Sequence, residues 1–366
     1  MKKRVLLISS GGLDKSGVPS VIMSIVRGMN EECTFDILLH TDKEGYFEQE
    51  FLSCGGKIFR FNKKKYPLSF LNRLAELVRP IALYGETRRL LRENGPYDVL
   101  HCHNDFDMAG CLAAGAKENV PVRVGHTHKT WNTDGGLVTR TYRRLCRRVI
   151  NRRATVRAGC SQVANRRFYG ENIPAQVVYD AYRDDQFVFD PNAAAPGNAP
   201  TVIQVGYFCD NKNQLFTLNV FRHLVEELPQ ARLCFVGADQ GNYGKTLREE
   251  AARLGMKDRV EFLPPDTDLP AALRKSALML FPSKAEGFGI VLIEAQASGL
   301  YCYASDAVPR ETTVGGVSYL SLSAGPDAWA EAILSEQKYQ HKTRYDCSKF
   351  SMKAFLDSIR RIYGLS

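Results

Sequence analysis

The sequence predicts an α/β protein made of two domains, each built on a doubly wound parallel sheet. Its 366 residues exceed the ~250–300 residues at which single hydrophobic cores stop growing. Apolar, β-branched runs alternate with helix-period segments from end to end, which is typical of parallel sheets covered by helices on both faces. Residues 190–200 hold three prolines and a glycine without any periodicity, which indicates a linker.

These patterns predict an N-terminal domain over 1–190, a linker over 191–200 and a C-terminal domain over 201–345. We expect 346–366 to form a helix that returns to the N-terminal domain, although its amphipathic stretch 354–363 could cover either one. The expected strands of the first half are 4–8, 35–40, 57–61, 99–103, 122–126 and 156–158, with helices over 18–29, 47–54, 68–93 and 137–150. The expected strands of the second half are 201–205, 232–236, 260–263, 278–281, 300–304 and 318–320.

Composition describes an ordinary globular chain with a basic bias. Hydrophobic residues make up 44% and charged residues 24%, which excludes disordered and fibrous classes. Lys+Arg 49 against Asp+Glu 40 gives a formal charge of +9, so nucleic acid, an anionic substrate and an anionic membrane all stay open as partners. The first apolar run, 5–8, is shorter than the ~7–15 residues of a signal peptide.

The cysteines and histidines favour a cytoplasmic enzyme without a metal. The ten cysteines are scattered and form no CxxC pair, so we expect reduced thiols. His101-Cys102-His103 resembles a fragment of a metal site, but adjacent strand residues point to opposite faces and no second ligand pair follows at finger-like spacing. We therefore expect no metal there.

Ligands of open α/β sheets bind where strands end, so the loops that follow strands are the places to search. The loop 9–20 matches neither nucleotide signature, because Val18 and Pro19 replace the Lys-Ser/Thr of a P-loop. Gly17 could mark a helix N-terminus that suits an anion, or it could be a turn glycine with Pro19 in the first helical turn. Both interpretations stay open.

The segment 281–297 carries the strongest signal. A strand ends at Pro282, a glycine-flanked turn follows, and an apolar helix begins near Gly289. The loop can offer backbone N–H groups to a diphosphate, while the Glu294 carboxylate can accept hydrogen bonds from the vicinal hydroxyls of a ribose. Glu286 lies at the strand end, where it would face a reacting sugar.

Glu286 and Glu294 form an E-x7-E signature, and 286–300 resembles the family-4 retaining glycosyltransferases of GT-B fold, especially those that build bacterial exopolysaccharides and capsules. Segments 98–103, 123–128, 305–311 and 317–322 also match, so the resemblance covers nearly the whole chain. It implies a GT-B fold with two Rossmann-like domains that face a cleft.

The resemblance also implies residue roles. The implied catalytic residues are His128, which would reach the donor sugar, Lys212, which would neutralise the diphosphate leaving group, and Glu286, which would contact the sugar. The implied donor-binding residues are Gly17, Tyr207, Asn213, Gly237, Leu263, Gly287, Phe288, Gly289, Ile290 and Glu294. The donor would be a nucleotide-diphosphate sugar, with UDP-sugar expected, and neither a cofactor nor a metal would be needed. Retention implies an α-linked product formed by front-face attack.

Three features of the sequence affect the roles that the resemblance implies. Tyr207 stands where the family places an arginine, and the lost charge-assisted contact is worth about 1.5–3 kcal/mol, so another cation replaces it or turnover falls. Asp180-Ala181 stands where relatives have Asn-Gly or Asn-Ala. Asp266-Thr267-Asp268 has the spelling of a DxD metal motif, but we expect Asp268 to cap the following helix.

A basic segment stands out in the first half. Residues 135–170 contain ten arginines and no Asp or Glu, with apolar residues interleaved near helical spacing. Such a helix can lie on an anionic membrane, or it can be solvated with its leucines packed on the sheet. No nucleic-acid module accompanies the charge, so we expect none as a partner. The expected membrane patch comprises Arg140, Arg143, Arg144, Arg147, Arg148, Arg152 and Arg153.

The leading hypothesis is a cytoplasmic glycosyltransferase, peripheral on the inner face of the plasma membrane, that moves a hexose or N-acetylhexosamine onto a lipid-linked or other glycan acceptor. A second hypothesis is a non-catalytic nucleotide-sugar-binding subunit of a biosynthetic complex, motivated by Tyr207. A third is a GT-B nucleotide-sugar epimerase. The sequence leaves the donor sugar, the acceptor and the oligomeric state open.

Overall fold

The computed structural model describes residues 1–61, 69–130, 136–191 and 199–365. The chain forms two compact units, Met1–Ala181 with Lys353–Ser366, and Tyr182–Met352. The first unit ends ahead of the predicted boundary at 190, because the N–H of Tyr182 donates to the carbonyl of Phe350 and Phe187 is buried in the second unit. Most of the predicted linker, 192–198, lies outside the described residues.

The first unit is built on a seven-stranded parallel sheet of order β3-β2-β1-β4-β5-β6-β7. The strand order reverses between β1 and β4, which is the switch point where open sheets bind ligands. Its strands are β1 (Lys3–Ser9), β2 (Cys33–Leu39), β3 (Ile58–Arg60), β4 (Val99–His103), β5 (Val122–Thr127), β6 (Val156–Gly159) and β7 (Gln176–Val177).

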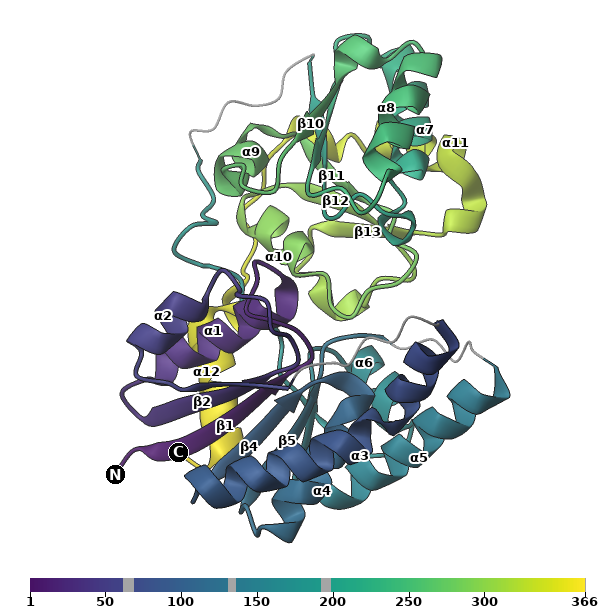
Figure 1. Ribbon diagram of the computed structural model, residues 1–366. Helices are drawn as coiled ribbons and strands as arrows, with labels where there is room; N and C mark the ends of the chain where they lie inside the picture. The colour runs from purple at the N-terminus through teal and green to yellow at the C-terminus, as the bar shows by residue number, and fades with distance from the viewer. Residues whose placement is uncertain (62–68, 131–135, 192–198, 366) are drawn as a thin grey trace. The chain divides into compact units, whose positions relative to one another are not determined.

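Helices cover both faces of this sheet. Figure 1 shows α3, α4 and α5 side by side over one face, with α1 and α12 on the other. The helices of the unit are α1 (Gly17–Met29), α2 (Glu48–Ser53), α3 (Ser69–Asn94), α4 (Met108–Lys117), α5 (Leu137–Arg153), α6 (Gln162–Tyr169) and α12 (Met352–Tyr363). One hydrophobic core fills the space between β1, β4 and the layer of α3, α4 and α5.

Helix α12 is the C-terminal segment and belongs to the first unit. Phe355, Ile359 and Ile362 share its buried face, a spacing of three and four residues that produces an apolar stripe. The Lys3 ammonium donates to the carbonyl of Tyr363 at 2.6 Å, which ties the end of the chain to its first strand.

The second unit has a six-stranded parallel sheet of order β10-β9-β8-β11-β12-β13. Its strands are β8 (Thr201–Val205), β9 (Arg232–Val236), β10 (Val260–Leu263), β11 (Leu278–Phe281), β12 (Tyr301–Ser305) and β13 (Val317–Leu320). Its helices are α7 (Gln214–Glu227), α8 (Tyr243–Arg253), α9 (Leu269–Lys275), α10 (Ile290–Ala297) and α11 (Gly325–Glu336). In Figure 1, α7, α8 and α11 cover one face and α9 and α10 the other.

The two doubly wound sheets confirm the predicted fold class, and every predicted strand is present within one or two residues at each end. The Asp268 carboxylate accepts a hydrogen bond from the N–H of Ala271, which confirms its predicted role as the N-cap of α9. The sequence analysis gave no range for α4, α6, α7, α8, α11 or the two-residue strand β7. Among the described residues, no helix combines the length and apolar character needed to cross a membrane.

Candidate active site

The loop that follows β11 places the E-x7-E signature. The loop ends at Gly289, whose φ of +95° lies in the left-handed region, and α10 begins at the next residue. No side chain caps α10. The N–H of Leu292 donates to Gly289 O, so the N–H groups of Ile290 and Val291 are the ones of the first turn without an intrahelical acceptor. This arrangement presents the positive end of the helix dipole to an anion.

Lys212 and Glu286 form an ion pair between two neighbouring strand ends. Lys212 closes the short 3₁₀ turn Asp210–Lys212 after β8, and Glu286 follows β11, which pairs with β8. The Lys212 Nζ lies 2.5 Å from Glu286 Oε1 and 4.9 Å above the centre of the Phe281 ring. Both side chains are mostly buried, and the pair holds the ammonium in place at the carboxyl end of the sheet.

Hydrogen bonds tie these two loops into one support. The N–H of Lys284 donates to Asn211 O at 2.8 Å, and the Asn211 amide donates to Ala285 O at 2.9 Å. Asn213, with a φ of +59°, donates its side-chain amide to Pro282 O. The side-chain amide of Asn213, a predicted donor-binding residue, is therefore engaged in holding the loops together.

The predicted nucleotide-binding positions gather at the ends of β8, β9 and β10. The N–H of Gly237 donates to Leu263 O at 3.1 Å. A Cβ on Gly237 would collide with the carbonyl oxygen of Gly206, so the ends of β8 and β9 approach too closely for any larger residue. Tyr207 follows directly, and 41% of its side chain is exposed.

Glu294 lies in α10, an otherwise apolar helix. Desolvation raises the pKa of its carboxyl from 4.5 to about 7, and the charge of Arg183 opposes this shift. Among the described residues, no hydrogen-bond donor reaches the carboxylate. An acidic group that is desolvated and lacks donors is poised to accept hydroxyl groups of a ligand.

The sequence analysis missed Gln296, a fully buried amide in the same helix. Its Nε2 donates to Leu292 O and Thr312 O, each at 2.9 Å, and its Oε1 accepts from the N–H of Val314 and of Gly316. These bonds fix the helix that carries Glu294 to the segment that leads into β13. The signal was an uncharged polar residue in an apolar helix, where only local partners could satisfy it.

Gly17 and His128 belong to the first unit. Gly17 begins α1, and a Cβ added to it would meet no described atom within 4 Å, so the space beside it is open. His128 follows β5 and is nearly buried. Its Nε2 lies 2.8 Å from His103 Nδ1, and its Nδ1 lies 3.6 Å from Asp180 Oδ1.

His101, His103, His126 and His128 form a histidine cluster, which the sequence analysis did not foresee. Residues i and i+2 of a strand share a face, so His101 and His103 lie together, and the neighbouring parallel strand β5 supplies a second His-x-His pair. The stacked rings of His101 and His126 have centroids 5.3 Å apart. Burial lowers the pKa of His101, His103 and His126, and neighbouring imidazoles lower it further.

Helix α5 carries the arginines of the predicted membrane patch. Arg140, Arg144, Arg148 and Arg152 are exposed and follow one another every four residues, which places them along one face. Leu137, Leu145 and Val149 form an adjacent exposed apolar row, with 82%, 55% and 37% of each residue accessible.

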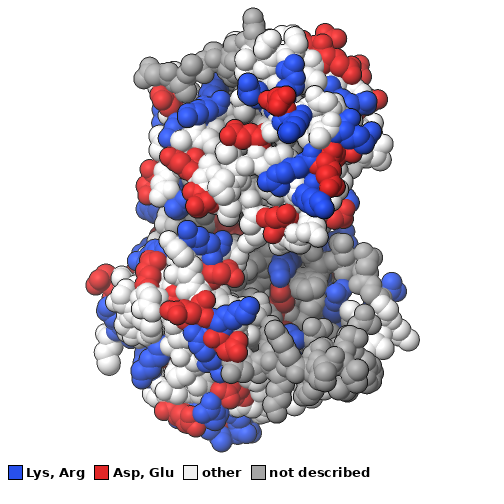
Figure 2. All heavy atoms as spheres, turned by 45° about the horizontal axis from the view of Figure 1, so that its top comes forward, with Lys and Arg blue, Asp and Glu red and all other residues white. Residues whose placement is uncertain are grey.

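Two of the seven predicted patch residues face the protein. Arg147 donates to Phe168 O and Arg167 O, and Arg143 lies over the ring of Phe106. A shallow hollow of about 510 Å³ on this helix is lined by Arg144, Arg147, Arg148, Asn151 and Arg152. On the face drawn in Figure 2, in contrast, basic and acidic residues are interspersed.

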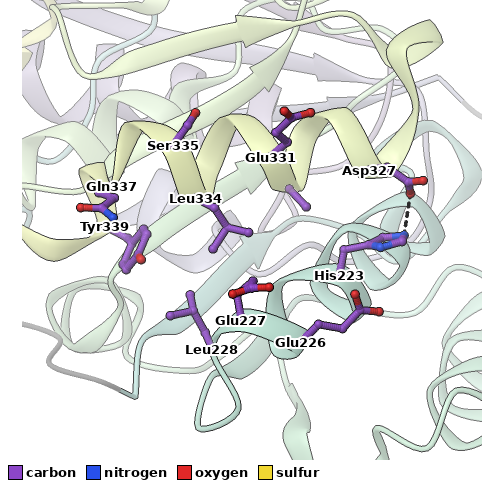
Figure 3. Close-up of a pocket in the computed structure, with 11 residues that line it drawn as sticks. His223, Glu226, Glu227, Leu228, Asp327, Glu331, Leu334, Ser335, Gln337 and Tyr339 are labelled. Carbon is purple, nitrogen blue, oxygen red and sulfur yellow. Dashed lines mark ion pairs between the residues drawn. The ribbon is translucent and has the colours of Figure 1, made fainter.

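A separate cavity of about 700 Å³ lies between α7 and α11, and Figure 3 shows the residues that line it. It contains none of the predicted site residues. Its wall includes Glu226, Glu227 and Glu331, and His223 Nε2 is paired with Asp327 Oδ1 at 2.5 Å. Acidic groups repel a diphosphate, so the cavity does not suit the predicted donor.

Family models identify both halves of the chain. Residues 16–179 match a model described as "Glycosyl transferase 4-like domain", and residues 185–351 match "Glycosyl transferases group 1". The chain belongs to the group 1, GT4-like glycosyltransferases. This confirms the resemblance stated from the E-x7-E signature, and with it the GT-B fold.

Similar proteins support the same family assignment. EpsF of Bacillus subtilis (strain 168), a provisionally named glycosyltransferase, is 29% identical to this glycosyltransferase over 91% of this chain and 87% of EpsF. The capsular polysaccharide biosynthesis glycosyltransferase CapH of Staphylococcus aureus is 24% identical over 96% of both chains. The crystal structure of Anabaena HepE with UDP has a TM-score of 0.78, at 17% identity over 100% of both chains. HepE has also been solved with UDP-glucose.

Proposed function

We propose that this glycosyltransferase transfers a hexose or N-acetylhexosamine from a nucleotide-diphosphate sugar to a lipid-linked glycan during cell-surface polysaccharide synthesis. The observation that carries the proposal is the Lys212–Glu286 pair at 2.5 Å, with the Glu294 carboxylate and the uncapped N-terminus of α10 on the same loop–helix unit. The names of EpsF and CapH support the pathway class. HepE bound to UDP supports a uridine diphosphate donor.

The diphosphate is the group that this site is built to hold. It would accept hydrogen bonds from the N–H groups at the start of α10 and contact the Lys212 ammonium. Lys212 is held by Glu286, so its charge is already positioned where negative charge develops as the sugar bond breaks, and no reorganisation is required at that moment. Glu286 would then contact the sugar, and Glu294 the ribose.

Retention follows from the family's front-face scheme, in which the departing phosphate oxygen takes the proton of the acceptor hydroxyl. In that scheme the leaving diphosphate needs charge stabilisation, which Lys212 and the helix dipole supply. His128 of the first unit is proposed as a further contact to the donor sugar. Gly17, which has open space beside it, is proposed to face phosphate.

Donor binding is the direct test. The purified protein would be titrated by calorimetry with UDP-glucose, UDP-galactose, UDP-N-acetylglucosamine and GDP-mannose, and transfer to a lipid-diphosphate acceptor would be followed by mass spectrometry. We expect one nucleotide sugar to bind and Glu294→Gln to weaken its binding. The matched control is Glu249→Gln on the exposed face of α8, where, among the residues that the structure describes, the carboxylate pairs with Lys245 alone. Failure to bind, hydrolyse or transfer any sugar in a wider panel would refute the proposal.

Tyr207 motivates the alternative of a non-catalytic, nucleotide-sugar-binding subunit. Its ring is exposed beside the Lys212 loop, at the position where the family has an arginine. Tyr207→Arg distinguishes the two: a large gain in transfer would indicate a decayed site, and a loss would indicate that Tyr207 is adapted to the reaction. An epimerase, the third candidate, would convert the donor to its epimer without any acceptor.

The proposed acceptor is lipid-linked, and we propose that α5 holds the enzyme on the inner, anionic face of the plasma membrane. The exposed row of arginines beside an exposed row of Leu137, Leu145 and Val149 supports this location. Leu145 and Val149 point to solvent, whereas Cys146 and Ile150 pack in the core, so the packing that the solvated-helix alternative requires leaves an exposed apolar row unused. Each arginine near an anionic surface contributes about 1 kcal/mol.

A further inference from the structure

We propose that His101, His103 and His126 bind a divalent transition-metal ion, Zn²⁺ in the first place, inside the first unit. The three imidazoles are buried, and one nitrogen from each lies within 4.8 Å of the other two. The fold creates this set: the register that pairs Cys102 with Gly125 places the ends of β4 and β5 side by side, with their histidines on one face. The metal proposal does not rest on sugar transfer, although His103 lies 2.8 Å from His128, the histidine proposed to contact the donor sugar.

One ligand nitrogen of the set has no partner. His103 Nε2 is buried and has no hydrogen-bond partner among the described residues. His126 faces His101 Nε2 through its Nδ1, and its other nitrogen, Nε2, is also buried without a described partner. A buried polar group without a partner is costly. The neutral imidazole ring is the form that binds a metal. A metal ion would therefore satisfy the His103 Nε2 lone pair, which the protein leaves unused.

Two of the three histidines have, at the nitrogen that faces away from the set, the partner that metal-bound histidines require, because such histidines donate their second N–H to an acceptor. His101 Nδ1 lies 2.8 Å from the Tyr363 hydroxyl at the end of α12. His103 Nδ1 lies 2.8 Å from His128 Nε2, and His128 Nδ1 faces Asp180. If Asp180 fixes the His128 proton on Nδ1, then His103 donates from Nδ1 and its Nε2 keeps a lone pair.

The donor set selects the kind of ion. Three imidazole nitrogens suit Zn²⁺, Cu²⁺ or Ni²⁺, whereas Ca²⁺ and Mg²⁺ require oxygen ligands. Zn–N bonds of about 2.0–2.1 Å place tetrahedral ligands about 3.3 Å apart. His101 Nε2 and His126 Nδ1 are already 3.1 Å apart. For both nitrogens to bind the metal, the proton that they share must move to the other nitrogen of one of the two rings, so that both imidazoles stay neutral.

Cobalt titration of the full-length, metal-depleted protein tests the site. We expect one equivalent of Co²⁺ to give visible d–d bands without the charge-transfer band of thiolate ligands, and Zn²⁺ to displace it. Elemental analysis after dialysis against Zn²⁺ should give one equivalent. His101→Gln and His126→Gln should each weaken binding at least 100-fold, while His341→Gln, an exposed histidine in the second unit, should not change it.

Tyr363→Phe removes the acceptor behind His101 and should weaken metal binding about 10–100-fold without touching the ligands. Circular dichroism would establish that each variant is folded. The wild-type titration decides the question even where a variant fails to fold, since absence of a stoichiometric, imidazole-ligated ion overturns the proposal. Unchanged affinity in both His→Gln variants would overturn it as well. Neither result would bear on nucleotide-sugar binding, which is measured separately.

Discussion

The two units share one architecture but carry opposite chemistry at the ends of their central strands. In the second unit, the site contains a cation, a paired carboxylate and Glu294, whose pKa is raised to about 7. In the first unit, the histidine cluster is buried and the pKa of three of its imidazoles is lowered. The carboxyl ends of parallel strands thus determine where a site lies, whereas burial and local charge determine what it can bind.

The largest effect is expected at Lys212, the charge on which the second unit depends. Lys212→Ala should lower kcat by about 10²–10³-fold, the range seen when one preorganised donor is removed from a developing negative charge. Donor affinity should change much less, because the N–H groups of α10 remain. The measurement is steady-state transfer together with calorimetric donor binding.

Lys284→Ala is the matched control for Lys212→Ala. Lys284 is in the same loop system, but its ammonium pairs with the exposed Asp210 carboxylate at 2.6 Å instead of with Glu286. Kinetics close to wild type are expected for this variant. Equal losses of kcat and affinity in Lys212→Ala would contradict the role assigned to the lysine.

The second prediction concerns the free energy of unfolding and Glu294. Its pKa is raised from 4.5 to about 7, so between these values the folded protein binds more protons than the unfolded chain and stability falls as pH rises. Glu294→Gln removes this penalty. At pH 8 the variant should be more stable by roughly 3.5 kcal/mol, at about 1.4 kcal/mol per pKa unit, and the gain should vanish below pH 4.5.

Urea unfolding at pH 4, 6 and 8 measures this profile, and the same variant should bind donor more weakly. A gain in stability together with weaker donor binding would show that Glu294 destabilises the folded protein but is needed to bind the ligand. A pH-independent difference between the variant and wild type would show that desolvation of the carboxyl is not its cause.

The contrast between the units also explains what the sequence could predict. Glu286, Gly289 and Glu294 are close together in the chain, and one strand–loop–helix places them, so a linear motif was sufficient. The histidine cluster needs the register of β4 against β5, which pairs residues more than twenty positions apart, and no spacing rule reports it. The sequence also could not reveal the hydrogen bonds that the side chains of Arg147 and Asn213 donate to backbone carbonyls, since those carbonyls belong to other segments.

Helix α4 shows why the fold prediction was incomplete. It is buried on nearly all sides, its small residues give no amphipathic stripe, and Asp107 at its N-cap position makes no side-chain capping hydrogen bond. Gly110 lowers helix propensity, yet a Cβ there would collide with the carbonyl of Pro80 in α3. The glycine is needed for close packing of α3 against α4, and this requirement appears only once both helices are in place.

The third prediction probes the first unit through Tyr363, whose hydroxyl joins α12 to the histidine cluster. Tyr363→Phe should lower the free energy of unfolding by about 1–2 kcal/mol, because the buried His101 Nδ1 loses its 2.8 Å partner. Tyr46→Phe, at an exposed tyrosine of the same unit, should have no effect. Donor binding by the second unit should not change in either variant. A loss of donor affinity in Tyr363→Phe would contradict the separation of the two sites.

The smallest effect is expected for α5, where several arginines each contribute a small part of the free energy of membrane binding. Arg148→Ala should weaken binding to phosphatidylglycerol vesicles about fivefold, since one arginine near an anionic surface contributes about 1 kcal/mol. Arg344→Ala removes an exposed arginine of the second unit and is the control. The difference between the variants should shrink as salt is raised, because screening weakens charge attraction but not the insertion of Leu145. Equal binding by both variants at low salt would show that α5 does not face the membrane.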